Sequence, residues 1–208
     1  MSDAAKLWFD AVTHTYSWGP IQDLAVELMS VSATMGHAEL VRTAYFTPES
    51  RDRGTNVHSL TEQFDAGLVD LDILADDPLL PYIQAWAQFK EDYNPKFSRT
   101  EWALGNPDMG YAGTIDRVGT LMLTAKGSMK RVRRRCVLDI KSGSKTPTHP
   151  VQLESPRAAT KLHRVCVYLN KKGTYKVEDY GTGGEADVLW NAALTVAKFR
   201  RFHKLTEG

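Results

Sequence analysis

The sequence predicts an α/β fold in which a central mixed β-sheet is flanked by helices. Helical apolar spacing dominates residues 1–95, residues 96–141 contain a run of segments that read as strands, and residues 148–205 read as helix, hairpin and helix. Elements in this order pack as layers, with helices covering the faces of the sheet. A chain of 208 residues is expected to form one domain, with a mainly helical N-terminal part (1–95) and a core with a closing helix (96–208).

The N-terminal part is expected to contain one strand and three helices. The strand is predicted over residues 13–18 and the helices over residues 21–31, 53–66 and 79–93. In the second helix Val57, Leu60 and Phe64 recur at helical intervals, and Gly67 follows as a candidate C-cap. The third has an apolar stripe that includes Trp86, which we expect to face the core.

The rest of the chain is expected to supply the sheet and its covering helices. Four strands are predicted over residues 97–104, 111–118, 121–125 and 131–141. Proline and Asx turn chemistry in residues 105–108 separates the first two. A mostly helical segment, a hairpin and an amphipathic helix follow, over residues 148–164, 165–179 and 186–205.

Composition narrows the class of protein. The formal net charge of +1 produces no global attraction to nucleic acid or membranes, so any such affinity must come from local patches. Cys136 and Cys166 are too few and too far apart for a zinc knuckle or a disulfide scaffold. The absence of a long apolar run or a signal-peptide core leads us to expect a cytoplasmic protein with no membrane contact.

Two short segments contain the main candidate functional residues. Asp116 ends the segment Gly-Thr-Ile-Asp (113–116), and Asp139 and Lys141 flank Ile140 about twenty residues later. Because a strand alternates its side chains, Asp139 and Lys141 share one face. Carboxylates suit a hard divalent cation and a lysine suits a phosphate. Solvated strand ends are the alternative, but aspartate is depleted in strand interiors, and these two lie in adjacent apolar strands.

The order of these residues along the chain resembles the PD-(D/E)xK nuclease superfamily, specifically its RecB-type branch, and most of all the small stand-alone nucleases of phages and prophages. The ordered set is His58, Glu101, Asp116, Asp139, Lys141 and Gln152. The matching segments fall within residues 53–153, about half of the chain. The resemblance implies a restriction-endonuclease-like core and metal-dependent hydrolysis of phosphodiester bonds.

A role can be assigned to each residue. Asp116, Asp139 and the backbone carbonyl of Ile140 are candidate ligands for Mg²⁺ or Mn²⁺, which prefer oxygen donors. The resemblance implies that His58 is a further metal ligand. Glu101 would complete a second metal site or orient a water.

The remaining two side chains are expected to act on water or phosphate. Lys141 would hold the attacking water or neutralise charge on the phosphate, and nearby carboxylates should keep it protonated. Gln152 would hydrogen-bond the water or a phosphate oxygen. More ordinary alternatives are a satisfied helix histidine for His58, a surface pair with Arg99 or Arg117 for Glu101, and a helix-start residue for Gln152.

The resemblance favours a DNA exonuclease that acts on ends or single strands in phage recombination or DNA processing, with a recombination partner protein as a further expectation. An endonuclease of restriction or junction-resolving type is one alternative, and a catalytically idle DNA-binding module is another. The four cysteines of an iron–sulfur cluster are missing, so no cluster is expected. Residues 143–146 lack the glycines of a phosphate loop, so no ATP site is expected.

A basic run precedes the second acidic segment. It contains Lys130, Arg131, Arg133, Arg134 and Arg135. Such a run can bind a nucleic-acid backbone, and it can equally protect an edge strand or form a solvated hairpin tip. Two departures from the family pattern are Ile115, in place of a proline, and Pro156, in place of a tyrosine, which is expected to bend the helix after Gln152.

Overall fold

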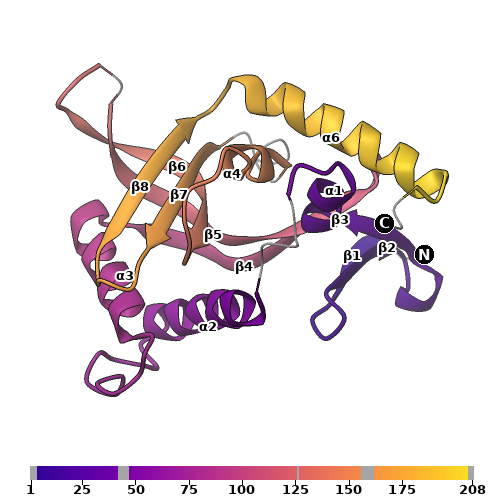
Figure 1. The fold of residues 1–208 in the computed structure, drawn as a ribbon. Coiled ribbons are helices and arrows are strands. Elements are labelled where there is room, and N and C mark those ends of the chain that lie inside the picture. The colour runs from indigo at the N-terminus through magenta and orange to yellow at the C-terminus, as the bar shows by residue number, and fades with distance from the viewer. Residues whose placement is uncertain (1–3, 42–46, 126, 156–161, 206–208) are drawn as a thin grey trace.

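The structure is a computed structural model that describes residues 4–41, 47–125, 127–155 and 162–205. These ranges form an α/β sandwich around an eight-stranded sheet, which confirms the predicted fold class (Figure 1). The strands are β1 (Lys6–Asp10), β2 (Thr15–Gly19), β3 (Val26–Ser30), β4 (Lys96–Asn106), β5 (Tyr111–Thr124), β6 (Arg131–Lys141), β7 (His163–Leu169) and β8 (Tyr175–Gly181). The helices are η1 (Gln22–Leu24), α1 (Val31–His37), α2 (Pro48–Asp65), α3 (Leu80–Tyr93), α4 (His149–Gln152) and α6 (Glu185–Phe202).

The sheet is mixed. Its strands follow the order β1-β2-β3-β5-β6-β7-β8, and β4 pairs with β5 off this path. The pairs β3–β5 and β6–β7 are parallel, and the other pairs are antiparallel. Parallel neighbours require a crossover connection, and the segment between β6 and β7 contains α4 on its way across the sheet.

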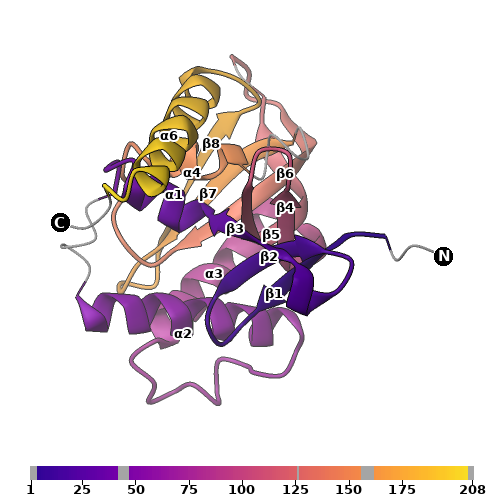
Figure 2. The same ribbon diagram turned by 90° about the vertical axis from the view of Figure 1, so that its right-hand side faces the viewer.

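Helices cover both faces of the sheet. Figures 1 and 2 show α2 and α3 on one side and α1, α4 and α6 on the other. On the first side Trp86 and Phe89 of α3 are fully buried against strand residues such as Leu138 and Val167. On the second side Trp190 of α6 packs with Tyr111 at the start of β5. Strands β5 and β6 lie at the centre of the sheet, between the two helical layers.

The N-terminal part differs from the prediction: strand β1 and helix α1 were not predicted, and one predicted helix is a strand. The helix predicted over residues 21–31 is wrong, because this segment forms the short η1 and then strand β3. Periodicity in a short apolar run does not separate helix from strand. Here β3 is fixed by antiparallel pairing with β2 and parallel pairing with β5, which a sequence pattern cannot report. The predicted strand and the other two helices are confirmed as β2, α2 and α3.

Two further boundaries are corrected. Residues 111–118 and 121–125 belong to one long strand, β5, rather than two. Gly119 lies at their junction, where a Cβ atom would come within 2.3 Å of the Lys96 carbonyl oxygen of β4, so the two backbones can pair only because no side chain is present. The mostly helical segment predicted over residues 148–164 contains the four-residue α4, and its last residues already belong to β7. Pro156, with its predicted bend, lies outside the described residues.

No helix in the described ranges combines the length and the apolar character needed to cross a membrane.

Candidate active site

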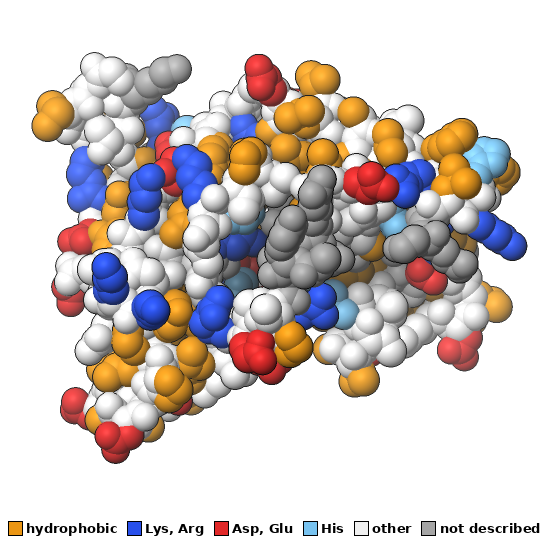
Figure 3. Space-filling model, viewed as in Figure 1, with side chains coloured by type: hydrophobic (Ala, Val, Ile, Leu, Met, Phe, Trp, Pro, Cys, Tyr) orange, Lys and Arg blue, Asp and Glu red, His pale blue; other side chains and the backbone are white. Residues whose placement is uncertain are grey.

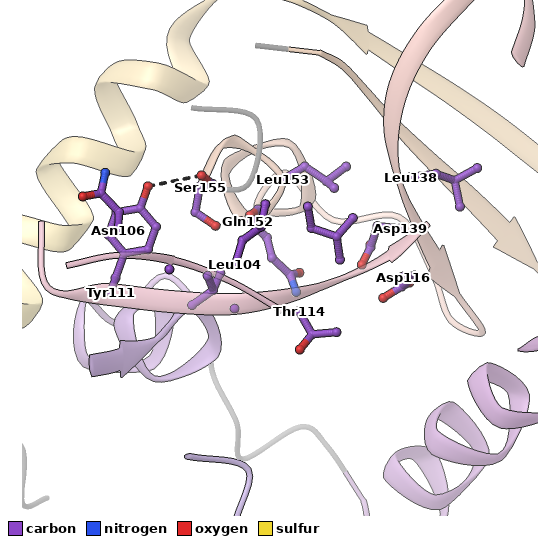
Figure 4. Close-up of a pocket in the computed structure, with 14 residues that line it drawn as sticks. Leu104, Asn106, Tyr111, Thr114, Asp116, Leu138, Asp139, Gln152, Leu153 and Ser155 are labelled. Atoms are coloured by element: carbon purple, nitrogen blue, oxygen red, sulfur yellow. Dashed lines mark hydrogen bonds between the residues drawn. The ribbon is translucent and has the colours of Figure 1, made fainter. Parts of the chain in front are cut away.

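The two acidic segments meet where β5 and β6 separate. Arg117 and Leu138 form the last pair of this antiparallel ladder, and the same register places Asp116 opposite Asp139 one step further on. Beyond this pair β5 and β6 separate, and we call this point the strand fork. Here the Ile140 N–H of β6 donates to a side chain instead of a backbone carbonyl: Asp116 Oδ2 accepts it at 2.6 Å. The aspartates are 8% exposed each and line one pocket (Figure 4). The strand fork thus brings both predicted acids to one place.

Residues from two other elements approach this fork. His58 of α2, Glu101 of β4 and Asp116 each offer a ligand atom, and these atoms lie within 4.8 Å of one another. Two carboxylates and an imidazole at such distances form a set of donors suited to a divalent cation. Figure 3 shows positively charged and histidine side chains near the centre of this face of the molecule.

The backbone of Ile140 connects His58 to the fork. His58 Nε2 lies 2.9 Å from the Ile140 carbonyl oxygen, which can only accept, so Nε2 carries the proton and donates. In the neutral ring Nδ1 then has a lone pair, and this atom lies 3.5 Å from Asp116 Oδ2. Two acceptor atoms that face each other need a positive charge between them, which a proton on Nδ1 or a bound cation can supply.

Lys141 lies on the other side of Asp139. Its Nζ is 2.8 Å from Asp139 Oδ2 and donates to Gln152 Oε1 of α4 at 3.3 Å. Burial opposes the charge of this ammonium, but Asp139 and Asp116 outweigh burial and raise the pKa of Lys141 above its usual value. Lys141 is therefore protonated at neutral pH, in agreement with the sequence prediction.

The acids repel one another electrostatically. Burial and the charge of Asp139 raise the pKa of Asp116, although His58 and the Ile140 N–H act in the opposite direction. Burial, followed by the charge of Asp116, raises the pKa of Glu101 to about 7. Burial and mutual repulsion thus hold both carboxyls above their ordinary pKa values, a pattern that is common at functional sites.

A buried ion-pair network behind Glu101 was missed by the sequence analysis. Arg117 is fully buried and donates to Asp65 Oδ2 (3.0 Å), to Glu101 Oε1 (3.2 Å) and to the carbonyl of Asp116 (2.7 Å). The predicted alternative, a surface pair between Glu101 and Arg117, is thus wrong about the location, because the arginine has no solvent exposure. Its signal in the sequence was a charged residue inside an apolar strand segment, directly after Asp116.

Glu101, which belongs to this network, has an unusual backbone conformation in β4. Glu101 has φ +44°, in the left-handed region that non-glycine residues rarely adopt. Such a conformation persists only where its surroundings hold it. The hydrogen bond from Arg117 is a contact that holds the Glu101 carboxylate beside Asp116.

Replacing Arg117 with methionine should lower the free energy of unfolding by about 3 kcal/mol, because it removes a fully buried guanidinium that pairs with both Asp65 and Glu101. Lys90→Met is the matched control. Lys90 pairs with the same Asp65 carboxylate at 2.7 Å but is 32% exposed, so its loss should cost about 1 kcal/mol or less. Urea denaturation of both variants measures the difference. Equal losses of unfolding free energy in the two variants would show that the burial of Arg117 does not strengthen its contribution to stability.

The side of the site near Lys141 contains further polar groups that the sequence did not indicate. Cys166 Sγ lies 3.6 Å from Asp139 Oδ2, and burial raises the pKa of this thiol, so it stays neutral. His149 Nδ1 is 2.8 Å from the Tyr168 hydroxyl. Burial and the charge of Lys141 lower the pKa of His149 to about 4. Both groups are thus neutral neighbours of the charged pair at neutral pH.

The basic run does not converge on this site. Arg131 donates to the carbonyl of Asp92 and Arg133 to that of Asn94, at the C-terminal end of α3. Arginines at this position satisfy helix-end carbonyls that lack an intrahelical partner. Arg131 is also eight strand residues from Asp139, about 27 Å along β6. DNA binding by these residues stays a prediction; a contact through Arg131 would lie far from the strand fork, whereas Arg135 is four strand residues from Asp139, about 13 Å along β6.

The chain was compared with known proteins. No model of a known protein family matches the sequence, and no curated protein matches it. Among solved structures, the chain is similar to the crystal structure of LHK-Exo in complex with dAMP, with 12% sequence identity and a TM-score of 0.43. The match covers 86% of this chain and 95% of that chain. A likeness this distant supports no statement about the chemistry of this chain.

Proposed function

We propose that this protein is a metal-dependent nuclease that hydrolyses phosphodiester bonds in DNA. The observation that supports this most is the approach of His58, Glu101 and Asp116 within 4.8 Å, next to an ammonium group held at 2.8 Å from Asp139. A phosphodiester is an anion, and it gains further negative charge in the transition state of hydrolysis. A cation bound by these acids and the protonated lysine beside it would both stabilise that charge.

The donors fit Mg²⁺ or Mn²⁺. Asp116, Asp139, the Ile140 carbonyl and His58 would hold one ion, and Glu101 would hold a second or a water. His58 would bind the ion through Nδ1, because Nε2 donates to the Ile140 oxygen. Nδ1 lies 3.5 Å from Asp116 Oδ2, near the roughly 3.0 Å expected between neighbouring ligands of an octahedral ion with bonds of about 2.1 Å. A bound ion would lower the pKa of its water and offset charge on the phosphate oxygens.

Side chains of the chain itself account for the remaining steps. Lys141 is protonated and lies beside Asp139, so it would stabilise the charge that develops on the phosphate or hold the attacking water. Gln152 is tied to Lys141 at 3.3 Å and would orient that water through its amide. No side chain needs to form a covalent intermediate, because water attacks directly.

Within this proposal, exonuclease action on ends or single strands rests on the sequence resemblance described above. A role in phage DNA recombination, a recombination partner protein and a cytoplasmic location have the same basis. The idle DNA-binding alternative is less favoured, because both acids line one pocket and the lysine lies 2.8 Å from Asp139.

A cleavage assay tests the function. The purified chain should degrade end-labelled linear DNA with Mg²⁺ or Mn²⁺ and should stop when EDTA is added. A circular DNA of the same sequence separates the alternatives, because an end-dependent enzyme spares it and an endonuclease opens it. Intact linear DNA under both metals would contradict the proposal and favour an idle module.

The raised pKa of Glu101 predicts a pH-dependent effect of the metal on stability. A folded-state pKa of about 7 lies above the usual value for glutamate of about 4.3. Glu101 therefore stabilises the metal-free fold fully below about pH 4, and this contribution is lost as pH rises through 7. A bound ion favours the ionised carboxylate, so Mn²⁺ should raise the melting temperature more at pH 8 than at pH 6.

Differential scanning fluorimetry with and without Mn²⁺ measures this effect. Glu101→Gln is the matched control, because the neutral amide removes the titration and should reduce the difference between the two pH values. A Mn²⁺ shift that is the same at pH 6 and pH 8 in the unmodified chain would contradict the assignment.

A further inference from the structure

The outward face of α6 is apolar. Its inward residues are buried as expected for a covering helix; they are Ala186, Trp190, Ala193, Leu194 and Ala197. The side chains opposite to them are also mostly hydrophobic, with Val188 71% exposed, Phe199 57% and Phe202 82%. Surface helices normally present charged residues on this side. Figure 3 shows orange side chains gathered along the edge of the molecule that α6 forms in Figure 1.

The exposed residues form one continuous stripe, which we call the α6 stripe. It consists of Val188, Leu189, Ala192, Thr195, Val196, Phe199 and Phe202. Val188, Ala192, Thr195, Phe199 and Phe202 recur at alternating intervals of four and three residues, and Leu189 and Val196 lie beside them. At 100° per residue the seven side chains stay on one side of the helix, opposite the buried face. The other exposed large hydrophobics of the described residues are scattered over other parts of the chain, whereas this set is contiguous over about four turns and about 21 Å. A patch of this kind indicates an interaction surface.

Charges flank the stripe in a repeated order. On one flank Asp187 lies in the first turn and Lys198 near the end of the helix, and on the other flank Glu185 comes early and Arg200 late. Among the described residues, Glu185 and Lys198 have no ion-pair partner. Each flank is therefore acidic at its N-terminal end and basic at its C-terminal end.

We propose that the α6 stripe is the contact surface for a second copy of this chain, with the two α6 helices antiparallel about a two-fold axis. This arrangement places the same flank of both helices side by side but in opposite directions. Asp187 of one copy then faces Lys198 of the other, and Glu185 faces the end that contains Arg200. A parallel arrangement would instead place like charges together, which is unfavourable. Antiparallel helix dipoles favour the same orientation.

The sizes of the stripe residues fit this geometry. With the helices centred on one another, Ala192 lies opposite Thr195 of the second copy, and Val188 lies opposite Phe199. Small residues at the middle allow the helix axes to approach closely, and the large residues pack on either side of that point. Such a two-fold contact buries the same patch on both copies and closes without forming a filament.

The rest of the molecule holds α6 in place for this contact. Arg200 pairs with Glu39 at 2.5 Å and Arg201 with Glu27 at 2.9 Å, which ties the C-terminal end of the helix to the segment after α1 and to β3. The buried face is anchored by Trp190, which is 1% exposed. The stripe is therefore presented on a helix whose opposite side is already fixed. This inference does not depend on the proposed nuclease activity.

Sedimentation velocity of the purified chain, from about 1 to about 100 µM, tests the proposal. The chain should sediment as a reversible dimer, and Phe199→Glu should raise the dissociation constant by at least about tenfold, because it puts a charge in the apolar contact. Met129→Glu is the matched control: Met129 is 97% exposed in the turn between β5 and β6, and its replacement should leave the dissociation constant unchanged. A monomer over the whole range, or equal effects of the two variants, would overturn the proposal.

A charge exchange tests the antiparallel arrangement separately. Asp187→Lys and Lys198→Asp should each weaken the dimer, and the double variant should restore it, because each new lysine again faces a new aspartate. Circular dichroism of each variant checks that the fold is kept. A dimer that the double variant fails to restore would overturn the antiparallel pairing.

Discussion

Replacing Asp139 with asparagine should lower the rate of DNA cleavage by at least about a thousandfold, which corresponds to about 4 kcal/mol of transition-state stabilisation. The amide keeps the shape of the side chain but removes the negative charge that would hold the ion and that pairs with Lys141 at 2.8 Å. DNA affinity without metal should stay within about threefold, because backbone contacts elsewhere dominate it. Single-turnover cleavage and fluorescence anisotropy measure the two quantities.

Asp108→Asn provides the control for this variant. Asp108 is an exposed aspartate in the turn between β4 and β5, so its replacement removes the same charge away from the strand fork. Its cleavage rate should be unchanged. An Asp139→Asn protein that keeps more than about a tenth of the activity would contradict a direct role for this carboxylate.

Replacing Lys141 with methionine should lower the cleavage rate by about a hundredfold to a thousandfold, as expected for the loss of one charge-stabilising donor. Methionine keeps most of the aliphatic chain and removes only the ammonium. Because a positive charge next to the site disappears, Mn²⁺ should bind at least as tightly as before. This separates Lys141→Met from Asp139→Asn, which should weaken Mn²⁺ binding. Isothermal titration calorimetry measures the affinity for the metal.

Lys145→Met is the matched control, since Lys145 is an exposed lysine that pairs with Glu178 at 2.8 Å. Its cleavage rate and Mn²⁺ affinity should not change. If Lys141→Met loses Mn²⁺ binding to the same degree as Asp139→Asn, the lysine acts by shaping the site rather than by contacting the phosphate.

The comparison of sequence and structure separates local from distant effects. The strands that carry Asp116 and Asp139 could be predicted, because alternation along a strand is a local property of the backbone. The helix over residues 21–31 could not be corrected from sequence, since the pairing of β3 with β5 joins residues that are about eighty positions apart. Likewise, the approach of His58 to Ile140 spans 82 positions.

The partners of charged residues also depend on contacts between distant parts of the chain. Arg117 and Arg131 look alike in the sequence, as arginines in or beside apolar strand segments. The structure buries Arg117 under α2 and α3, where it holds Glu101 and Asp65, and it places Arg131 at the end of α3. Which partner a long charged side chain finds depends on the packing of helices over the sheet, and no local pattern encodes that packing.

The sequence by itself determined the fold class and the two acidic strand segments, because these follow from periodicity and residue chemistry within short windows; the ordered set of six candidate site residues was identified through the family resemblance and stays a prediction. Only the tertiary structure decided that β5 and β6 part at Asp116, that a buried arginine pairs with the Glu101 carboxylate, and that α6 has an apolar outer face. Each of these depends on contacts between segments distant in the chain, whose free energy comes from packing and pairing that form together on folding.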